Sequence, residues 1–213
     1  MPSHNSAKSP GFPLVISAPS GTGKSTVCRK LLERNKFLRC SISCTTRPPR
    51  FAERNGRDYF FLDSEEFKRK IHRHDFLEWA IVHEAYYGTP RQPLEAHIAS
   101  GHIVMLAIDV QGAMSIRRKR PDTVTVFLMP PSWDCLEERL RRRRQDPHDA
   151  VDRRLAQAPV EMNHAKSFDY VVVNDSLDKA VQQLESIIGA EKLRTGRQNL
   201  SAYHVDNAVI RRK

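Results

Sequence analysis

The feature that most constrains the fold of this chain is a short apolar run followed by a glycine-rich loop that ends in lysine and serine. Residues 14–17 form the run, residues 18–25 form the loop, and the spacing of Val27, Leu31 and Leu32 predicts a helix after it. Glycines let the backbone curl so that successive N–H groups point inward at an anion. The helix adds the partial positive charge of its N-terminus. A strand, loop and helix in this order predict a phosphate-binding loop for a nucleoside triphosphate.

Two side chains of this loop carry chemistry of their own. Lys24 is expected to reach the outer phosphates, and the hydroxyl of Ser25 is expected to ligate magnesium. Ala18 stands where the motif usually has its first glycine, so an ordinary Gly/Ser-rich turn is the alternative interpretation; the flanking strand and helix favour the phosphate loop. The residues predicted to bind the triphosphate here are Ala18, Pro19, Ser20, Gly21, Thr22, Gly23, Lys24, Ser25 and Thr26.

The excess of basic residues indicates anionic partners. The formal net charge is +10, and much of the excess lies in clusters at residues 117–120, 139–144 and 211–213. Nucleic acid and the phosphates of a small substrate are both compatible with such clusters, and so is a solvated basic face. Charge alone therefore does not choose the partner.

Length and apolar content limit the class of protein. A chain of 213 residues forms one domain, or one core with an inserted subdomain. Its apolar runs have the length of strands, well short of the roughly 20 residues that cross a bilayer, so no membrane partner is expected. Residues 1–11 are predicted to be a disordered leader without the apolar core of a signal peptide. The four cysteines lack C-x-x-C spacing, which argues against a zinc site and favours a reducing, cytoplasmic location.

Apolar, β-rich runs alternate with helical patterns along the chain. Ser132 is expected to cap a helix, and Pro159 is expected to kink or split the helix in which it lies. The alternation predicts an α/β fold, a five-stranded parallel sheet wrapped by helices. Strands are expected at residues 12–18, 102–109, 123–129 and 170–175, and helices at residues 25–35, 90–100, 110–120, 148–167 and 177–194.

Residues 40–87 differ in character from the rest. They combine short extended pieces, a short helix capped by Asp63 and several arginines, which predicts an inserted α+β subdomain. In open parallel sheets, ligands bind at the carboxyl ends of the strands. The phosphate loop, Asp109 at the end of an apolar run and the arginine-rich helix are therefore expected to meet at one edge of the sheet.

A second motif lies inside the inserted segment. Arg47 and Arg50 bracket two prolines, and such a pair of guanidinium groups is suited to bind a phosphate. The hydroxyl of Tyr59 adds a further donor. Residues 76–80, with the sequence F-L-E-W-A, and residues 86–89, with the sequence Y-Y-G-T, then supply a carboxylate, aromatic rings and a hydroxyl.

Together these motifs closely resemble those of the guanylate kinases, from about Phe12 to Arg194. The resemblance is carried by the phosphate loop and by the strings T-T-R-P-P-R, E-R-N-G-R-D-Y, F-L-E-W-A, Y-Y-G-T, I-D-V-Q-G and V-V-N-D in this order. It implies transfer of the γ-phosphoryl group of ATP to GMP with Mg²⁺. It also implies a GMP-binding subdomain at about residues 40–89, a lid at about residues 137–155 and a basic tail at residues 195–213, in a monomer or homodimer.

The resemblance assigns roles to individual residues. The GMP-binding residues are Ser43, Arg47, Arg50, Glu53, Tyr59, Glu78, Tyr87 and Thr89. The residues that act on the transferring phosphoryl group are Lys24, Asp109, Arg139, Arg143 and Arg154, while Asn174 and Asp175 lie on the adenine side. Ser25 and Asp109 are the implied magnesium-binding residues. The carboxylate of Glu78 suits guanine because it accepts from both N1–H and N2–H, whereas the corresponding edge of adenine presents an acceptor.

The chain departs from the family pattern at two functional places. The family usually has an aspartate two residues before Asp109, where this chain has Ala107. Loss of one hydrogen bond to a charged group predicts weaker use of GMP or looser base selectivity. Both glycines of the usual R-L-x-G-R-G lid string are arginines in residues 139–144, which predicts a stiffer lid.

Three alternatives to an active guanylate kinase follow from the sequence. A non-catalytic interaction module of the same fold is expected to lose the phosphate loop, yet Lys24, Ser25 and Asp109 are present. The second alternative is a nucleic-acid-binding protein, but no recognition motif in the sequence supports it. The third alternative is a kinase that phosphorylates another acceptor. Only Ala107 favours it, whereas Arg47 and Glu78 argue for GMP.

Overall fold

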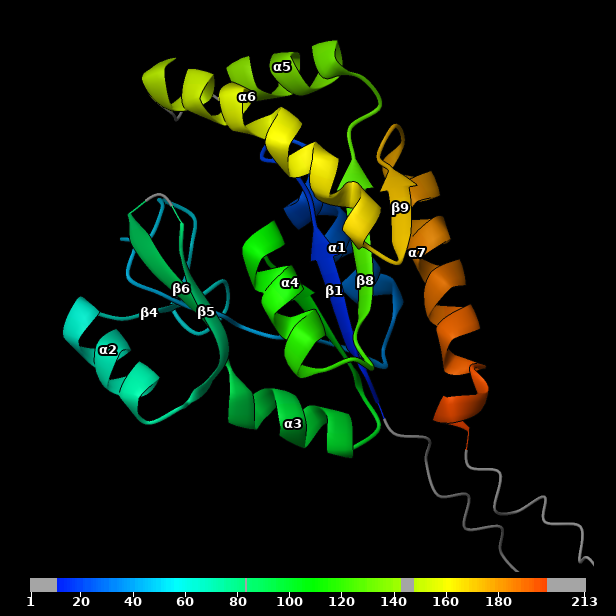
Figure 1. The fold of residues 1–213 in the computed structure, drawn as a ribbon. Coiled ribbons are helices and arrows are strands. Elements are labelled where there is room, and N and C mark those ends of the chain that lie inside the picture. Colours follow the sequence, from blue (N-terminus) through cyan, green and yellow to red (C-terminus); the bar gives the residue numbers. More distant parts are fainter. Residues whose placement is uncertain (1–10, 83, 143–147, 199–213) are drawn as a thin grey trace, which may run out of the picture.

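The computed structural model describes residues 11–82, 84–142 and 148–198. Its main sheet has five strands in the order β2-β7-β1-β8-β9, all pairs parallel (Figure 1). This confirms the predicted five-stranded parallel sheet. The strands are β1 (Pro13–Ser17), β2 (Leu38–Cys40), β7 (Ile103–Ala107), β8 (Val124–Met129) and β9 (Tyr170–Val173).

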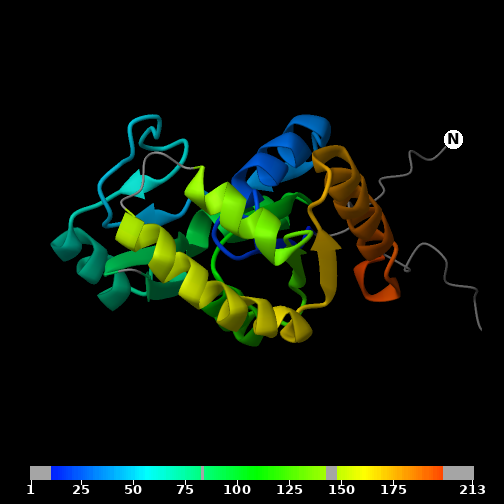
Figure 2. The ribbon, with the colours of Figure 1, turned by 90° about the horizontal axis from the view of Figure 1, so that it is seen from above.

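The central strands are apolar throughout because helices cover both faces of the sheet. On one face, Leu14 and Ile16 pack against α1 (Lys24–Arg34) and α7 (Leu177–Lys192). On the other face, Val15 packs with α3 (Arg91–Ala99) and α4 (Val110–Lys119). The view from above shows α1 and α7 side by side at one end of the molecule (Figure 2).

The inserted segment forms a second, four-stranded sheet in the order β4-β3-β6-β5. Its antiparallel β5–β6 hairpin stands apart from the main sheet, and α2 packs against it through Phe67 and Phe76 (Figure 1). Asp63 caps α2, as predicted, by accepting from the N–H of Glu66. The elements are β3 (Cys44–Thr45), β4 (Phe60–Phe61), α2 (Ser64–His72), β5 (Phe76–Val82) and β6 (Ala85–Pro90).

Two further helices lie at the end of the sheet toward which the strands point (Figure 1). Ser132 caps α5 (Trp133–Arg141) as predicted, by accepting from the N–H of Cys135. Pro159 does not split α6 (His148–Asn163), which runs through it and continues into the 3₁₀ turn η1 (His164–Ser167). The two helices share the buried side chains Leu136, Leu140, Val151, Leu155 and Ala158.

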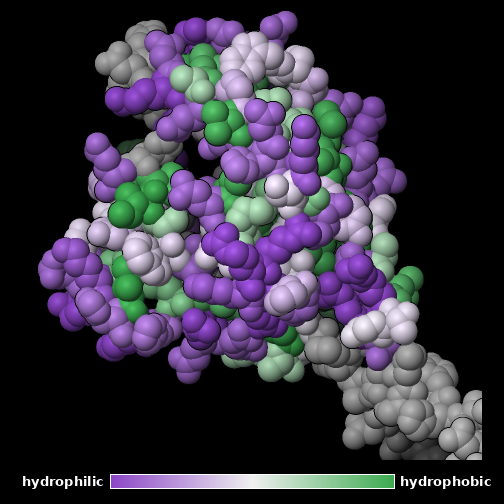
Figure 3. All heavy atoms as spheres, viewed as in Figure 1, coloured by the Kyte–Doolittle hydropathy of each residue, from purple (hydrophilic) through white to green (hydrophobic). Residues whose placement is uncertain are grey.

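The space-filling view is hollowed between the α5–α6 pair and the β5–β6 hairpin (Figure 3). Hydrophilic residues make up most of this face, with apolar side chains scattered among them. Among the described residues, no helix combines the length and the apolar character needed to span a bilayer.

After α7 the chain makes a short 3₁₀ turn, η2 (Thr195–Arg197). The guanidinium of Arg197 lies 3.9 Å from the centre of the Phe12 ring and donates to the buried carboxylate of Glu191. The first residues of the predicted tail are thus attached to the start of β1, and the tail beyond Gln198 lies outside the described residues.

Candidate functional site

The loop after β1 has the backbone shape expected of a phosphate loop. Gly21 and Gly23 have φ angles of 89° and 95°, which side chains rarely allow. A Cβ at Gly21 would lie 2.8 Å from Leu140, and one at Gly23 would lie 2.7 Å from the amide nitrogen of Asn174. Both positions therefore need glycine, because the φ angles are positive and because a Cβ would come too close to neighbouring side chains. Gly23 then starts α1, whose first residues are Lys24, Ser25 and Thr26.

Asn174 and Arg139 form hydrogen bonds with the backbone of this loop. The side-chain amide of Asn174 is buried and donates to the carbonyl of Thr22 at 2.7 Å. The guanidinium of Arg139 donates to the same carbonyl at 3.2 Å and to the carbonyl of Asn174 at 3.3 Å. These bonds connect the phosphate loop, α5 and the end of β9. The neighbouring Asp175 is exposed and accepts from the N–H of Ser176.

Lys24 and Asp109 lie where β1 and β7 end. The ammonium group of Lys24 donates to the carbonyl of Ile108 at 2.6 Å. Burial lowers the pKa of Lys24, although the nearby Cys28 and the carboxylates of Asp109 and Glu161 act in the opposite direction. Asp109 caps α4 by accepting from the N–H of Gly112 at 3.0 Å. Ser25 is exposed beside them.

In the inserted subdomain, Arg47 is held by a carboxylate and by aromatic rings. Its two terminal nitrogens donate to the two oxygens of Glu53 at 2.8 and 2.9 Å, and its Nε donates to the hydroxyl of Tyr87 at 3.1 Å. Its guanidinium also lies 5.3 Å from the centre of the Tyr59 ring. Burial acts to raise the pKa of Glu53, but the hydrogen bonds from Arg47 and from the backbone of Arg50 lower it overall.

Glu78 is a buried carboxylate on β5, with 4% of its surface exposed. It lies opposite Thr89 on β6, whose hydroxyl donates to Glu78 Oε1 at 2.6 Å. Burial raises the pKa of Glu78 to about 7; the hydrogen bond from Thr89 opposes this and the charge of Asp109 adds to it. A Cβ at Gly112 would lie only 3.1 Å from Glu78 Oε2, so the close approach of α4 depends on glycine.

One cavity joins the two halves of the predicted site. It has a volume of about 140 Å³ and is lined by Lys24 and Asp109 from the core and by Glu78 from the hairpin. Ala107 lies in its wall, where the sequence departs from the family pattern. Ser43, Tyr59 and Tyr87 complete the side that belongs to the inserted subdomain.

Besides Arg139, two predicted residues belong to the predicted lid. Arg154 is half-buried on α6, and Arg143 lies outside the described residues. Sequence reasoning missed Glu161, also on α6, which lines a cavity together with Asp109 and whose pKa is raised by burial, while the nearby ammonium group of Lys24 acts to lower it. Its spacing of seven residues from Arg154 was the available signal, because residues so spaced share one face of a helix.

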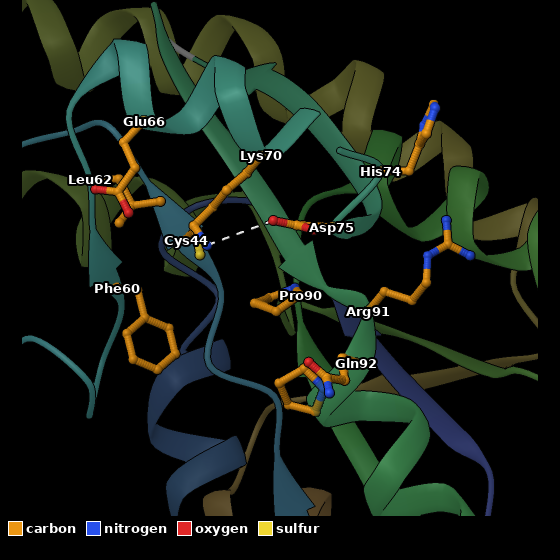
Figure 4. A pocket seen from close by; sticks show the side chains of 11 residues that line it. Cys44, Phe60, Leu62, Glu66, Lys70, His74, Asp75, Pro90, Arg91 and Gln92 are labelled. Atoms are coloured by element: carbon orange, nitrogen blue, oxygen red, sulfur yellow. Dashed lines mark ion pairs between the residues drawn. The ribbon is translucent and has the colours of Figure 1, made fainter. Parts of the chain in front are cut away.

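A second cavity lies on the other face of the subdomain sheet, since neighbouring residues of a strand point to opposite faces. It has a volume of about 500 Å³, and Cys44, Phe60 and Leu62 line it beside the start of α3 (Figure 4). Lys70 faces Asp75 at 3.9 Å across it. None of the predicted site residues lines this cavity.

Comparisons with known proteins agree with this geometry. The sequence profile described as guanylate kinase matches residues 11–191. A guanylate kinase of Caldanaerobacter subterraneus subsp. tengcongensis is 44% identical over 192 residues, covering 90% of this chain and 93% of its own length. One of Nitrosomonas europaea is 49% identical over 184 residues, covering 86% and 92%. The crystal structure of guanylate kinase from Anaplasma phagocytophilum aligns with a TM-score of 0.79 and 36% identity over 92% of this chain and 94% of that one. The chain therefore belongs to the guanylate kinase family.

Proposed function

We propose that this chain transfers the γ-phosphoryl group of ATP to GMP and releases ADP and GDP. The observation that carries the proposal is the cavity lined both by Lys24 of the phosphate loop and by Glu78 of the inserted subdomain. A carboxylate beside a phosphate loop suits GMP. The carboxylate can bind the guanine base while the phosphate of GMP lies next to the donor phosphate. Family membership supports the same reaction.

The donor side is proposed to be the phosphate loop, residues 18–26. Its backbone N–H groups surround the outer phosphates of ATP, and Lys24 moves from the Ile108 carbonyl to them. The hydroxyl of Ser25 and the carboxylate of Asp109 are oxygen donors, the type that Mg²⁺ prefers. With ATP they would hold this ion, which supplies neutralising charge at the β- and γ-phosphates. Asn174 keeps the loop in shape, and Asp175 lies on the adenine side.

The acceptor side is proposed to be the inserted subdomain, about residues 40–89. Glu53 and Tyr87 hold the guanidinium of Arg47 in a fixed orientation, ready to bind the GMP phosphate. Arg50, Tyr59 and Ser43 add donors to this phosphate. Glu78 accepts from guanine N1–H and N2–H, and the hydroxyl of Thr89 lies near O6.

Transfer itself needs positioning and charge neutralisation more than covalent chemistry from the protein. Arg139, Arg143 and Arg154, in a lid of about residues 137–155, are proposed to neutralise the transferring phosphoryl group. The phosphate of GMP is already a nucleophile, so the reaction requires no general base. A cytoplasmic location is proposed because all four cysteines are free thiols, as is usual in a reducing compartment.

The test is a coupled assay of ADP release with GMP, dGMP, AMP, IMP or no acceptor. Rapid turnover with guanine nucleotides, slow turnover with IMP and none with AMP are expected. Lys24→Ala is expected to abolish the activity, whereas Lys30→Ala, on the same helix, retains it. Turnover with AMP as fast as with GMP, or ADP release that needs no acceptor, refutes the assignment.

A further inference from the structure

The strand that carries Glu78 contains a β-bulge directly before this residue. On β5, Phe76 lies opposite Pro90 of β6. Glu78, two residues further along β5, lies opposite Thr89, which is only one residue away from Pro90. Leu77 is therefore the extra residue of the bulge. A bulge leaves its extra residue outside the regular ladder and changes the direction in which nearby side chains point.

The bulge decides which face of the hairpin carries Glu78. In a regular strand, Phe76 and Glu78 would point to the same face. Here Phe76 stacks on Phe67 inside the inserted subdomain. Glu78 instead points toward α4, where its Oε2 lies 3.1 Å from the position that a Cβ of Gly112 would take. The extra residue thus turns the carboxylate away from the subdomain core and into the cavity that Lys24 also lines.

Two cations from helices outside the hairpin bind the backbone carbonyls at the bulge. Lys119, the last residue of α4, donates from its ammonium group to the carbonyl of Leu77 at 2.7 Å. Arg91, the first residue of α3, donates to the carbonyl of Phe76 at 3.2 Å. The opposite residue, Pro90, has no N–H to offer this carbonyl. Carbonyls that lack a donor in the ladder need one from elsewhere, and here α3 and α4 supply it.

Lys119 is the better placed of the two cations to control Glu78. Its acceptor, Leu77, directly precedes Glu78 in the chain and packs in the same core cluster as α4. Lys119 follows Gly112 by seven residues, so both lie on one face of α4. This face therefore touches the carboxylate at one end and bonds the bulge at the other. Burial raises the pKa of Glu78, and the charge of Lys119 acts against that effect.

We propose that Lys119 is a positioning residue for base recognition: its bond to the Leu77 carbonyl holds the bulge in the shape that aims Glu78 at guanine. This inference rests on the proposed function, because that function gives Glu78 its base. Guanine donates from N1–H and N2–H and needs both carboxylate oxygens in place, whereas the base of IMP donates from N1–H alone. A displaced carboxylate therefore weakens GMP binding more than IMP binding.

The test compares Lys119→Met, Lys119→Arg and the control Arg118→Met in the full chain. Methionine keeps an unbranched side chain but removes the charge and the donors, whereas arginine keeps both. Arg118 is the exposed neighbour on the same helix, so its replacement removes one positive charge from the same cluster. Calorimetry gives the Kd for GMP and for IMP, steady-state kinetics give kcat and KM, and melting temperatures report folding.

Lys119→Met is expected to raise the Kd and the KM for GMP by about fivefold or more, because a hydrogen bond from a charged donor is lost. The preference for GMP over IMP is expected to fall by about threefold or more, since the second bond to the base is lost first. The value of kcat at saturating GMP and the KM for ATP stay within about twofold. Lys119→Arg is expected to restore most of the GMP affinity, and Arg118→Met behaves like the unmodified chain.

Three results overturn the inference. The first is unchanged GMP affinity in Lys119→Met. The second is an equal loss of affinity for GMP and IMP, which would make Lys119 a structural residue of the hairpin without a part in base recognition. The third is an arginine variant as weak as the methionine variant, which would show that a charged donor is not what the bulge needs.

Failure of the proposed function can be told apart from failure of this inference. If the unmodified chain binds GMP but does not phosphorylate it, the proposed function fails, and the Kd values for GMP and IMP still decide the role of Lys119. If the unmodified chain phosphorylates GMP and Lys119→Met keeps its preference over IMP, only the inference fails. If the unmodified chain does not bind GMP, both fail.

Discussion

Replacing Glu78 by glutamine is expected to change activity and stability in opposite directions. Glutamine keeps the shape and can still accept from Thr89, but it offers guanine one acceptor and one donor in place of two acceptors. Each lost hydrogen bond to a charged group costs about 1.5–3 kcal/mol. With two bonds affected, kcat/KM for GMP is expected to fall by about 10²- to 10⁴-fold. AMP, whose edge presents a donor and an acceptor, gains relative to GMP.

The same substitution should stabilise the free protein. Burial raises the pKa of Glu78 from 4.5 to about 7, so keeping it ionised at pH 8 costs up to about 3 kcal/mol of folding free energy. Because this pKa is raised, the cost is absent below pH 4.5, grows as the pH rises, and is complete above pH 7. Removing it is worth roughly 6–12 °C in melting temperature at pH 8 for a chain of this length, and little near pH 4.5.

Two assays decide this prediction. Initial rates over a range of GMP and AMP concentrations give the change in kcat/KM, and thermal melts at pH 5 and pH 8 give the change in stability. Thr123→Val, a buried change outside the site, serves as the control for core substitutions in general. A variant that uses GMP within threefold of the unmodified chain, or that melts lower at pH 8, refutes the reasoning about Glu78.

Three further predictions concern the same acceptor pocket. The KM for GMP is expected to fall as the pH rises from 6.5 to 8 and then to level off, because GMP binding needs ionised Glu78 with its pKa of about 7; a flat profile contradicts this, and the KM for ATP is the internal control. Ala107→Asp is expected to raise kcat/KM for GMP by about 10-fold or more, through one added hydrogen bond to a charged group; unchanged kinetics would remove Ala107 as a cause of weak GMP use. Gly112→Ala is expected to raise the KM for GMP, because the new Cβ would lie 3.1 Å from Glu78 Oε2. Gly189→Ala on α7, where nothing lies within 4 Å of the added Cβ, is the matched control, and equal KM values for the two variants would count against the crowding argument.

The central sheet could be predicted because its strands carry their own signal. Continuous apolar runs around Val15, Leu106 and Phe127 are typical of parallel strands covered on both faces. The fifth strand, β2, has only three residues, and two of them, Arg39 and Cys40, are exposed. No periodicity marks so short an edge strand, so Cys40 was expected in the inserted subdomain, whereas it ends β2.

The types of the site residues could also be predicted, but their mutual contacts could not. Arg47 and Glu53 lie in one motif, yet nothing in the sequence says that the glutamate forms a two-point pair with that arginine. The amide of Asn174 was expected on the adenine side. Its hydrogen bond to the Thr22 carbonyl joins residues far apart in the sequence, so no local pattern predicts it. Glu161 is one carboxylate on a polar helix face, and only the position of α6 above the loop distinguishes it.

The reaction itself is tested most directly by ³¹P nuclear magnetic resonance of the unmodified chain with ATP, GMP and Mg²⁺. The proposed transfer predicts that the resonances of ATP and GMP decline together while those of ADP and GDP rise in equal amounts, with no inorganic phosphate. ADP and inorganic phosphate beside unchanged GMP would show hydrolysis of ATP instead, and would contradict the assignment of Glu78 and Arg47 to an acceptor nucleotide.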